Sequence, residues 1–272
     1  MLKFERNLEK SVYEKLKESN LWKDHLREDC KKQEVFLAIR DNDIGFYHRG
    51  GRLFHFDEKR GFKTHYKYAS VIENTDNDYL TEKELITQKL ISDFSGYYDQ
   101  IKKNCKLYSG VEAQGVSEIY HKYPYSSTEN IVVLDIEVSF EALDKTNAKT
   151  QDRIDILLYD VKNQSLKFVE AKHYSNGEIA PKEKPDVVKQ IKNYENQVDL
   201  KGSEIINAYT KYIYAINDIF GIDLPKPKYV DKKVALLIFG FDEDQNKGRL
   251  TCIIHNTFWI FHFLKNGSVF FH

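Results

Sequence analysis

The spacing of apolar residues changes along the N-terminal part of the chain. In residues 1–30, leucines and Val12 recur near the helical repeat among lysines and glutamates, which predicts one or two amphipathic helices broken near Ser19-Asn20. From Glu34 onward, apolar and polar residues alternate in short aromatic runs, a pattern typical of β-strands. Gly50-Gly51, between two of these runs, predicts a hairpin loop of two residues. A helical segment followed by a β-meander is therefore expected.

A short polar stretch predicts a linker after the meander. Glu73–Asp78 reads ENTDND and is rich in turn-forming residues. Thr81 and Glu84 then form a capping box, which is typical of the start of a helix. We therefore expect an accessory helical and β-meander region over residues 1–78 and a second domain over residues 79–272.

Helices and strands alternate in the second domain. The expected elements are a helix over 111–123, a strand over 130–141, two strands between Asp152 and Lys172, helices over 186–200 and 203–220, strands over 232–241 and 249–256, and an aromatic segment over 259–264. The order helix, three strands, helix, strand predicts the α/β (α+β) class, with a mixed central β-sheet flanked by helices. The N-terminal helices and meander are expected to be an extension of this domain.

Two neighbouring strands carry charged residues inside strongly apolar runs. Asp155 in RIDILL, and Glu170 and Lys172 in LKFVEAK, occupy alternate positions, so each strand directs its charges to one face. If Asn163-Gln164 is a two-residue loop, Asp155 lies directly opposite Lys172 and all three residues share a face. Carboxylates crowded on one patch of sheet are costly unless a cation joins them. This hairpin is the strongest candidate for a functional site.

The composition is that of a soluble globular protein. With 272 residues and 41% hydrophobic content, the chain can bury a substantial core. Its net charge of −1 gives no global sign of a polyanionic partner. We find no signal-peptide core and no apolar run of membrane length, so a cytoplasmic protein without membrane association is expected. The separated cysteines Cys30, Cys105 and Cys252 suit free thiols better than disulfides or a zinc site.

An acid two residues before a lysine is a weak signal, because this pattern starts at six positions: Asp29, Asp57, Asp160, Glu170, Asp199 and Asp231. Only at Glu170-Ala171-Lys172 does it close an apolar strand that follows another strand carrying an acid, Asp155. These residues resemble the PD-(D/E)XK nuclease superfamily. Gln190 and Tyr194, four residues apart and so on one helix face, resemble the Gln-X-X-X-Tyr element of its RecB-like branch.

The resemblance covers roughly residues 110–242 and implies a restriction-endonuclease-like core that hydrolyses phosphodiester bonds with a metal ion. Asp155, Glu170 and the backbone carbonyl of Ala171 would hold Mg²⁺ or Mn²⁺, since these are hard cations that prefer oxygen ligands. Lys172 would orient or deprotonate the attacking water, or stabilise the charge that develops on the phosphate.

Other members of such a site are less sharply defined. The family has a further acid upstream, for which Glu118 in VSEIYHKY is the first candidate and Glu137 in LDIEVS the second, with Asp135 behind it. The choice among them stays open. Gln190 and Tyr194 would position the substrate backbone or a water molecule.

The resemblance therefore implies a metal-dependent nuclease, acting on DNA rather than RNA, in prokaryotic defence or DNA processing. The alternative is a catalytically inactive nuclease-fold module that acts through protein or nucleic-acid contacts. Residues 1–78 would offer a surface for a homodimer or a protein partner. The arginines, lysines and aromatic residues of the meander either bind a nucleic-acid strand or form one solvated and one buried sheet face.

Overall fold

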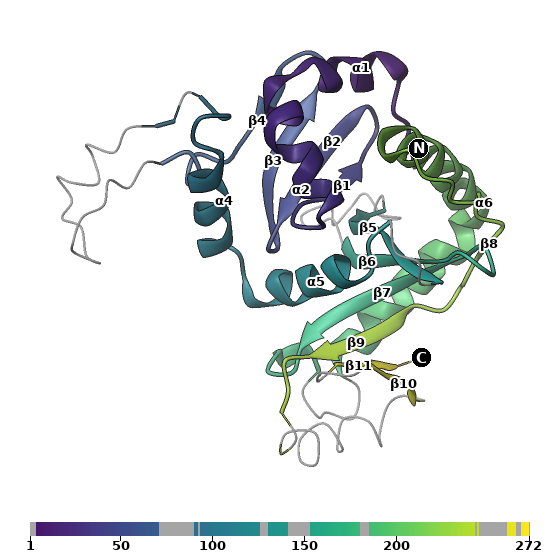
Figure 1. The fold of residues 1–272 in the computed structure, drawn as a ribbon. Helices are drawn as coiled ribbons and strands as arrows, with labels where there is room; N and C mark the ends of the chain where they lie inside the picture. The colour runs from purple at the N-terminus through teal and green to yellow at the C-terminus, as the bar shows by residue number, and fades with distance from the viewer. Residues whose placement is uncertain are drawn as a thin grey trace, which may run out of the picture. The chain divides into compact units, whose positions relative to one another are not determined.

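The structure, a computed structural model, has a mixed α+β fold (Figure 1). It describes residues 4–70, 90–91, 93–125, 130–140, 153–179, 185–242 and 244, and the backbone of 260–264 and 268–271. The chain divides into two compact units, Leu8–Ser117 and Met1–Asn7 with Glu118–His272. The expected boundary between residues 78 and 79 lies outside the described residues, as do the Glu73–Asp78 linker and the Thr81 capping box. No helix in the described part of the chain is long and apolar enough to span a membrane.

The first helix of the Leu8–Ser117 unit lies where the apolar spacing predicts a helix. Val12 and Leu16 are buried, and the break comes at Ser19, as expected. The helices are α1 Lys10–Glu18, the π-helical turn η1 Trp22–Leu26, α2 Arg27–Lys31, α4 Tyr98–Leu107 and α5 Val111–Lys122, which continues into the other unit. The α5 bounds confirm the predicted helix over 111–123, whereas α4 was not predicted. Trp22 packs against Phe46 of the sheet, with ring centroids 6.1 Å apart.

The expected β-meander is confirmed. Its strands β1 Phe36–Ile39, β2 Asp43–His48, β3 Gly51–Asp57 and β4 Gly61–Lys63 pair antiparallel in that order. The β2–β3 loop is Arg49-Gly50 and not Gly50-Gly51, because His48 pairs with Gly51. Both loop residues have positive φ, 48° and 87°, as a two-residue turn of this kind requires. A Cβ on Gly50 would also clash with the backbone of Ala113.

A mixed sheet forms the centre of the other unit. Its strands are β5 Ile131–Ser139, β6 Arg153–Asp160, β7 Ser165–His173, β8 Tyr229–Val230, β9 Ala235–Phe239, β10 Ile260–Leu264 and β11 Ser268–Phe271. The order is β10-β11-β9-β7-β6-β5, and β8 also pairs with β7. The strands β5, β6 and β7 are antiparallel neighbours, whereas β7 and β9 are parallel and are joined through a helix. The predicted order helix, three strands, helix, strand is therefore present.

The connecting helix α6, Asp186–Phe220, is one helix of 35 residues, so the prediction of two helices was wrong. Its buried face continues past Gly202, with Val198, Ile205 and Ala208 all fully buried. A glycine in a helix costs only about 1 kcal/mol, which this continuous burial outweighs. The helix ends at Gly221, whose φ of 67° is left-handed.

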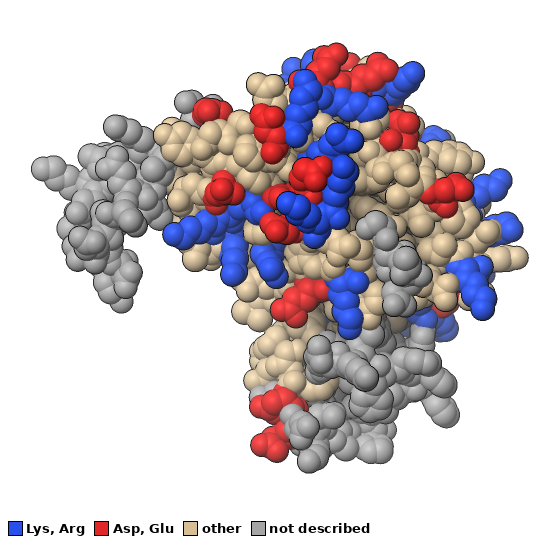
Figure 2. Space-filling view, viewed as in Figure 1, with Lys and Arg blue, Asp and Glu red and all other residues tan. Residues whose placement is uncertain are grey.

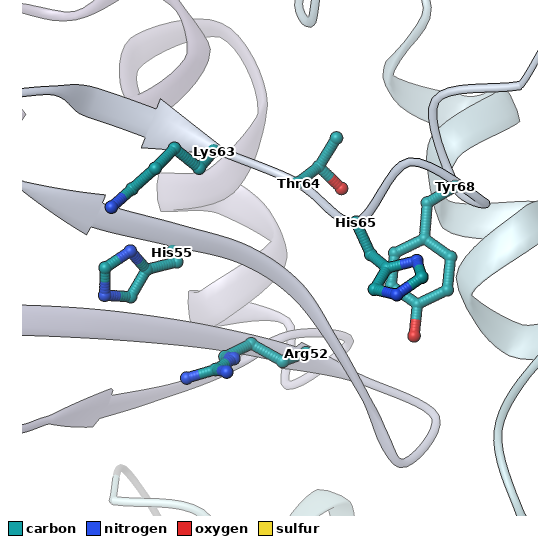
Figure 3. A pocket seen from close by; sticks show the side chains of 6 residues that line it. All are labelled: Arg52, His55, Lys63, Thr64, His65 and Tyr68. Carbon is teal, nitrogen blue, oxygen red and sulfur yellow. The ribbon is translucent and has the colours of Figure 1, made fainter.

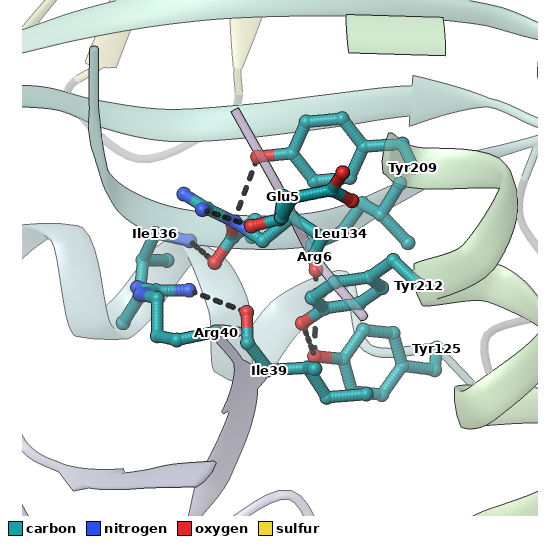
Figure 4. Close-up of polar contacts among 10 residues, drawn as sticks. Glu5, Arg6, Ile39, Arg40, Tyr125, Leu134, Ile136, Tyr209 and Tyr212 are labelled. Carbon is teal, nitrogen blue, oxygen red and sulfur yellow. Dashed lines mark hydrogen bonds and ion pairs between the residues drawn. The ribbon is translucent and has the colours of Figure 1, made fainter. Parts of the chain in front are cut away.

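A buried ion pair ties the start of this unit to the sheet (Figure 4). Asp135 of β5 is fully buried, and its carboxylate accepts hydrogen bonds from Arg6 Nε at 3.0 Å and from the Tyr209 hydroxyl of α6 at 2.8 Å. The guanidinium of Arg6 also lies 4.4 Å from the centroid of the Phe4 ring. Asp135 therefore already has a structural cation.

Charges of both signs are interspersed on the face of the described residues that Figure 2 shows. This agrees with the net charge of −1. Recognition of a charged ligand must therefore come from local groups of side chains.

Removing Arg6 should destabilise the protein strongly, because Asp135 would be left as a buried carboxylate without its cation. We expect Arg6→Met to lower the free energy of unfolding by about 3–5 kcal/mol. Tyr209→Phe should cost about 1–3 kcal/mol. Urea unfolding followed by circular dichroism measures both.

The control is Lys10→Met, which removes an exposed ion pair with Glu14 and should change stability by less than about 1 kcal/mol. The double variant Arg6→Met/Asp135→Leu should recover much of the loss, because no buried charge remains. Equal stability of Arg6→Met and the parent chain would contradict the assigned role.

Candidate active site

The hairpin of β6 and β7 brings the predicted charged residues together in a register that differs from the expected one. Asp160 pairs with Ser165, so the loop has four residues, 161–164, and the prediction that Asp155 lies opposite Lys172 was wrong. The longer loop is held by the Asp160 carboxylate, which accepts hydrogen bonds from the backbone and side-chain nitrogens of Asn163 at 2.9 and 2.7 Å. A shift of two residues preserves the alternation of faces, so the charged residues still converge.

Asp155 is held against the neighbouring strand by a backbone hydrogen bond. Its Oδ2 accepts the N–H of Ala171 at 2.7 Å. Counting one residue outward from the Ile156–Val169 pair places Asp155 beside Glu170. The half-buried carboxylate of β6 is thus fixed next to the Glu-X-Lys segment of β7.

Glu170 is an almost completely buried acid, with 1% of its surface exposed. Its Oε1 lies 2.8 Å from Lys172 Nζ. Its Oε2 is buried and has no hydrogen-bond partner among the described residues. Burial, and then the negative charge of Asp155, raise the pKa of Glu170 to about 8 despite the opposing effect of Lys172. The oxygen without a hydrogen-bond partner and the raised pKa both mark a carboxylate whose charge Lys172 only partly neutralises.

Lys172 is also buried, and two carboxylates hold its ammonium group. Nζ lies 2.8 Å from Glu170 and 2.7 Å from Oε2 of Glu178. Burial lowers the pKa of Lys172, but the attraction of Glu170 and Glu178 outweighs burial and keeps the pKa above its ordinary value. The lysine therefore stays protonated at neutral pH.

Glu178 is a site residue that the sequence did not single out. It lies on the 3₁₀ turn η3 Gly177–Ile179, where no helix or strand was predicted. The turn is anchored by Ile179, which is fully buried. An aliphatic residue in an otherwise polar stretch was the one signal that this segment packs against the domain.

Gln190 and Tyr194 share one face of α6, as predicted. Nε2 of Gln190 donates to the Tyr194 hydroxyl at 3.0 Å, and that hydroxyl donates to the backbone carbonyl of Arg153 at 2.8 Å. Arg153 precedes Asp155 by two residues on β6. The pair therefore fixes α6 against the strand that carries Asp155.

The proposed upstream acids differ in their surroundings. Glu118 is exposed on α5, and Glu137 of β5 forms an ion pair with Arg153 at 3.6 Å. Asp135 is engaged by Arg6 and Tyr209. Across the described residues no group of three or more Asp, Glu, His or Cys side chains could hold a metal ion. The choice of Glu118 or Glu137 as a ligand stays a prediction.

Asp155 and Glu170 nevertheless fit a hard divalent cation. Mg²⁺ often binds through only one or two carboxylates and keeps several of its waters. Glu170 supplies a buried oxygen without a hydrogen-bond partner in the described structure, and the adjacent Asp155 carries a second carboxylate. A cation here would relieve the repulsion between the two acids. The donor set suits Mg²⁺ or Mn²⁺ better than a soft metal.

Comparisons of the chain with protein-family models, with curated proteins and with solved structures find no match.

Protein stability should depend on pH through Glu170. Its pKa is higher in the folded state than the ordinary value of 4.5, so its contribution to stability is complete below pH 4.5 and is lost as the pH rises through about 8. Glu170→Gln removes this loss. We expect the variant to melt at a higher temperature than the parent chain at pH 8.5 in EDTA, with a smaller difference in its favour, or none, at pH 5.

The matched control is Glu118→Gln, an exposed substitution in the same unit, which should follow the parent chain at both pH values. The prediction fails if the melting temperatures of Glu170→Gln and the parent chain differ by the same amount at pH 5 and at pH 8.5. Ionisation of the buried Glu170 would then carry no cost in stability.

Proposed function

We propose that the chain is a metal-dependent nuclease that hydrolyses phosphodiester bonds, in DNA rather than RNA. The observation that carries the proposal is the convergence of Asp155, Glu170 and Lys172 on adjacent strands, with one buried Glu170 oxygen lacking a hydrogen-bond partner in the described structure. The order of α5, β5, β6, β7, α6 and β9 supports a restriction-endonuclease-like core. A role in prokaryotic defence or DNA processing accompanies this proposal.

The metal would be held by Asp155, Glu170 and the backbone carbonyl of Ala171. When bound, Mg²⁺ or Mn²⁺ supplies a positive charge beside the scissile phosphate and lowers the pKa of a coordinated water. Glu118 or Glu137 would add a further carboxylate. These assignments require the two acids on β6 and β7 to stay in their observed register.

Lys172 would act as a fixed cation. Because Glu170 and Glu178 keep its pKa high, its ammonium group carries a proton at neutral pH and serves as a hydrogen-bond donor. It is thus suited to orient the attacking water or to bind a phosphate oxygen as negative charge develops. This favours the orienting and charge-stabilising roles over deprotonation of the water.

Gln190 and Tyr194 would position the reacting groups. The Tyr194 hydroxyl holds the β6 backbone next to Asp155, and so acts on the site through the strand. Gln190 is half-buried at the N-terminal end of α6, where its amide would contact the substrate backbone.

An inactive binding module is the second candidate, and one observation favours it. The Lys172 ammonium group already forms ion pairs with two carboxylates. Among the described residues, no third acid joins Asp155 and Glu170 to form a group that could hold a metal ion. The module would bind nucleic acid or a protein without cleaving either. Cleavage assays with Mg²⁺ and Mn²⁺ separate the two functions.

Removing the Lys172 charge should abolish cleavage. Lys172→Met keeps the aliphatic stem and should reduce metal-dependent cleavage of single- and double-stranded DNA by at least about a hundredfold, since it removes the charge that stabilises the transition state. Lys167→Met, on the opposite face of the same strand, should cleave normally. Undiminished cleavage by folded Lys172→Met would rule out the assigned role.

Metal affinity tests the ligands separately from activity. Asp155→Asn retains an oxygen for the Ala171 N–H but loses the charge, so it should weaken Mn²⁺ binding at least about tenfold in calorimetry. Glu170→Gln should do the same. Of Glu118→Gln and Glu137→Gln, the one that weakens Mn²⁺ binding identifies the upstream ligand. Unchanged affinity in Asp155→Asn would contradict the metal site.

A further inference from the structure

The β-meander of the Leu8–Ser117 unit contains a pocket of about 420 Å³ (Figure 3). Its lining residues are Arg52, His55, Lys63, Thr64, His65 and Tyr68. Volumes of about 300–1,000 Å³ are typical of small-molecule sites. Cationic and imidazole groups dominate the lining, and a negatively charged ligand therefore suits it best.

A β-bulge directs Arg52 into this pocket. Phe46 pairs with Phe54 and the next residue, Tyr47, pairs with Arg52, so Leu53 is an extra residue in β3. In a regular strand, residues three apart point to opposite faces, but the extra residue brings Arg52 to the face of His55. Leu53 itself is fully buried. Bulges of this kind commonly re-aim a functional side chain.

Two of the basic side chains that line the pocket already contact acids. Lys63 lies directly opposite His55 in the β3–β4 pairing, and its Nζ lies 2.6 Å from Oδ2 of Asp57. Nε of Arg60 lies 3.5 Å from the same Asp57 oxygen. His55 itself is bound to the carboxylate of Asp43.

Arg52 differs from these two side chains. Its guanidinium makes no hydrogen bond or ion pair with any residue in the described part of the chain, and the residue is exposed. A guanidinium presents a planar set of donors that matches the oxygens of a phosphate. Arg52 is therefore available to a ligand without breaking an existing contact.

Aromatic rings line the other part of the pocket. The rings of His65 and Tyr68 have centroids 5.4 Å apart, and both line the pocket in Figure 3. The Thr64 hydroxyl donates to the Leu53 carbonyl at 2.7 Å, which fixes this segment to the bulge. Flat rings beside cations are the combination that binds a nucleobase and its phosphate.

We propose that this pocket binds a nucleotide unit. In this arrangement the Arg52 guanidinium binds the phosphate, with His55 and Lys63 nearby. The base packs against the rings of His65 and Tyr68. The binding does not require the metal site, because all the lining residues belong to the Leu8–Ser117 unit. The ligand is either a free mononucleotide or one nucleotide of a single strand, and both present the same phosphate and base.

The test measures binding to the full chain in EDTA, so that no cleavage occurs. The probes are a fluorescent single-stranded DNA of about a dozen nucleotides, followed by anisotropy, and AMP, followed by calorimetry. We expect Arg52→Gln to weaken binding at least about tenfold, and to reduce the slope of log affinity against log salt for the strand by about 0.7. His65→Ala should weaken the strand or AMP several-fold through lost stacking.

Arg27→Gln is the matched control, since Arg27 is an exposed arginine of α2 in the same unit that does not line the pocket. It should bind as the parent chain does. Binding of AMP identifies a free nucleotide as the ligand, and binding of the strand alone identifies a nucleic acid. The proposal fails if neither probe binds, or if Arg52→Gln and the parent chain bind equally. Binding is measured in EDTA, where no metal-dependent cleavage occurs, so failure of the nuclease proposal remains distinguishable.

Discussion

The carboxylate of Asp155 accepts the backbone N–H of Ala171 at 2.7 Å, and the candidate site depends on this bond between neighbouring strands. It places an acid of β6 beside the two side chains that flank Ala171 on β7, Glu170 and Lys172. The strand alternation then directs both of those side chains to the same face. A one-residue slip of the hairpin would turn Asp155 away from them, so the loop at residues 161–164 is part of the construction of the site.

This arrangement has an energetic cost. Burial and the charge of Asp155 raise the pKa of Glu170 to about 8, so a protein at neutral pH keeps an acid in a place that disfavours its charge. Lys172 relieves part of this cost through one Glu170 oxygen, and Glu178 shares the same ammonium group. Sites that trade stability for chemistry commonly have this character. The buried network is therefore not explained by a gain in stability.

The sequence predicted the parts of the fold that depend on local periodicity. The meander, α5 and the three antiparallel strands follow from apolar spacing, and the shared face of Gln190 and Tyr194 follows from the helical repeat. Asp155 and Glu170 were found because charges inside apolar strands are conspicuous. The hairpin register failed because it depends on loop length, and here the side chain of Asp160 stabilises a longer loop than the local sequence suggested.

Long-range contacts account for the other misses. Glu178 contacts Lys172 from a turn that the buried Ile179 anchors, and the continuity of α6 through Gly202 depends on the sheet it covers. The direction of Arg52 toward the pocket depends on a bulge that no spacing rule reveals, since the bulge is defined by the pairing of β3 with β2. Such features belong to tertiary structure rather than to any one segment.

The long helix α6 has a mechanical consequence. It is bonded to β6 through Tyr194 and to β5 through Tyr209, two points separated by about 22 Å along its axis at the usual rise per residue. A helix that is hydrogen-bonded at two points to two adjacent strands resists changes in the twist between those strands. The angle at which β6 presents its acid to β7 is therefore set partly by a tyrosine that is remote from the acid. The positional accuracy of the site is a property of the whole helix and sheet together.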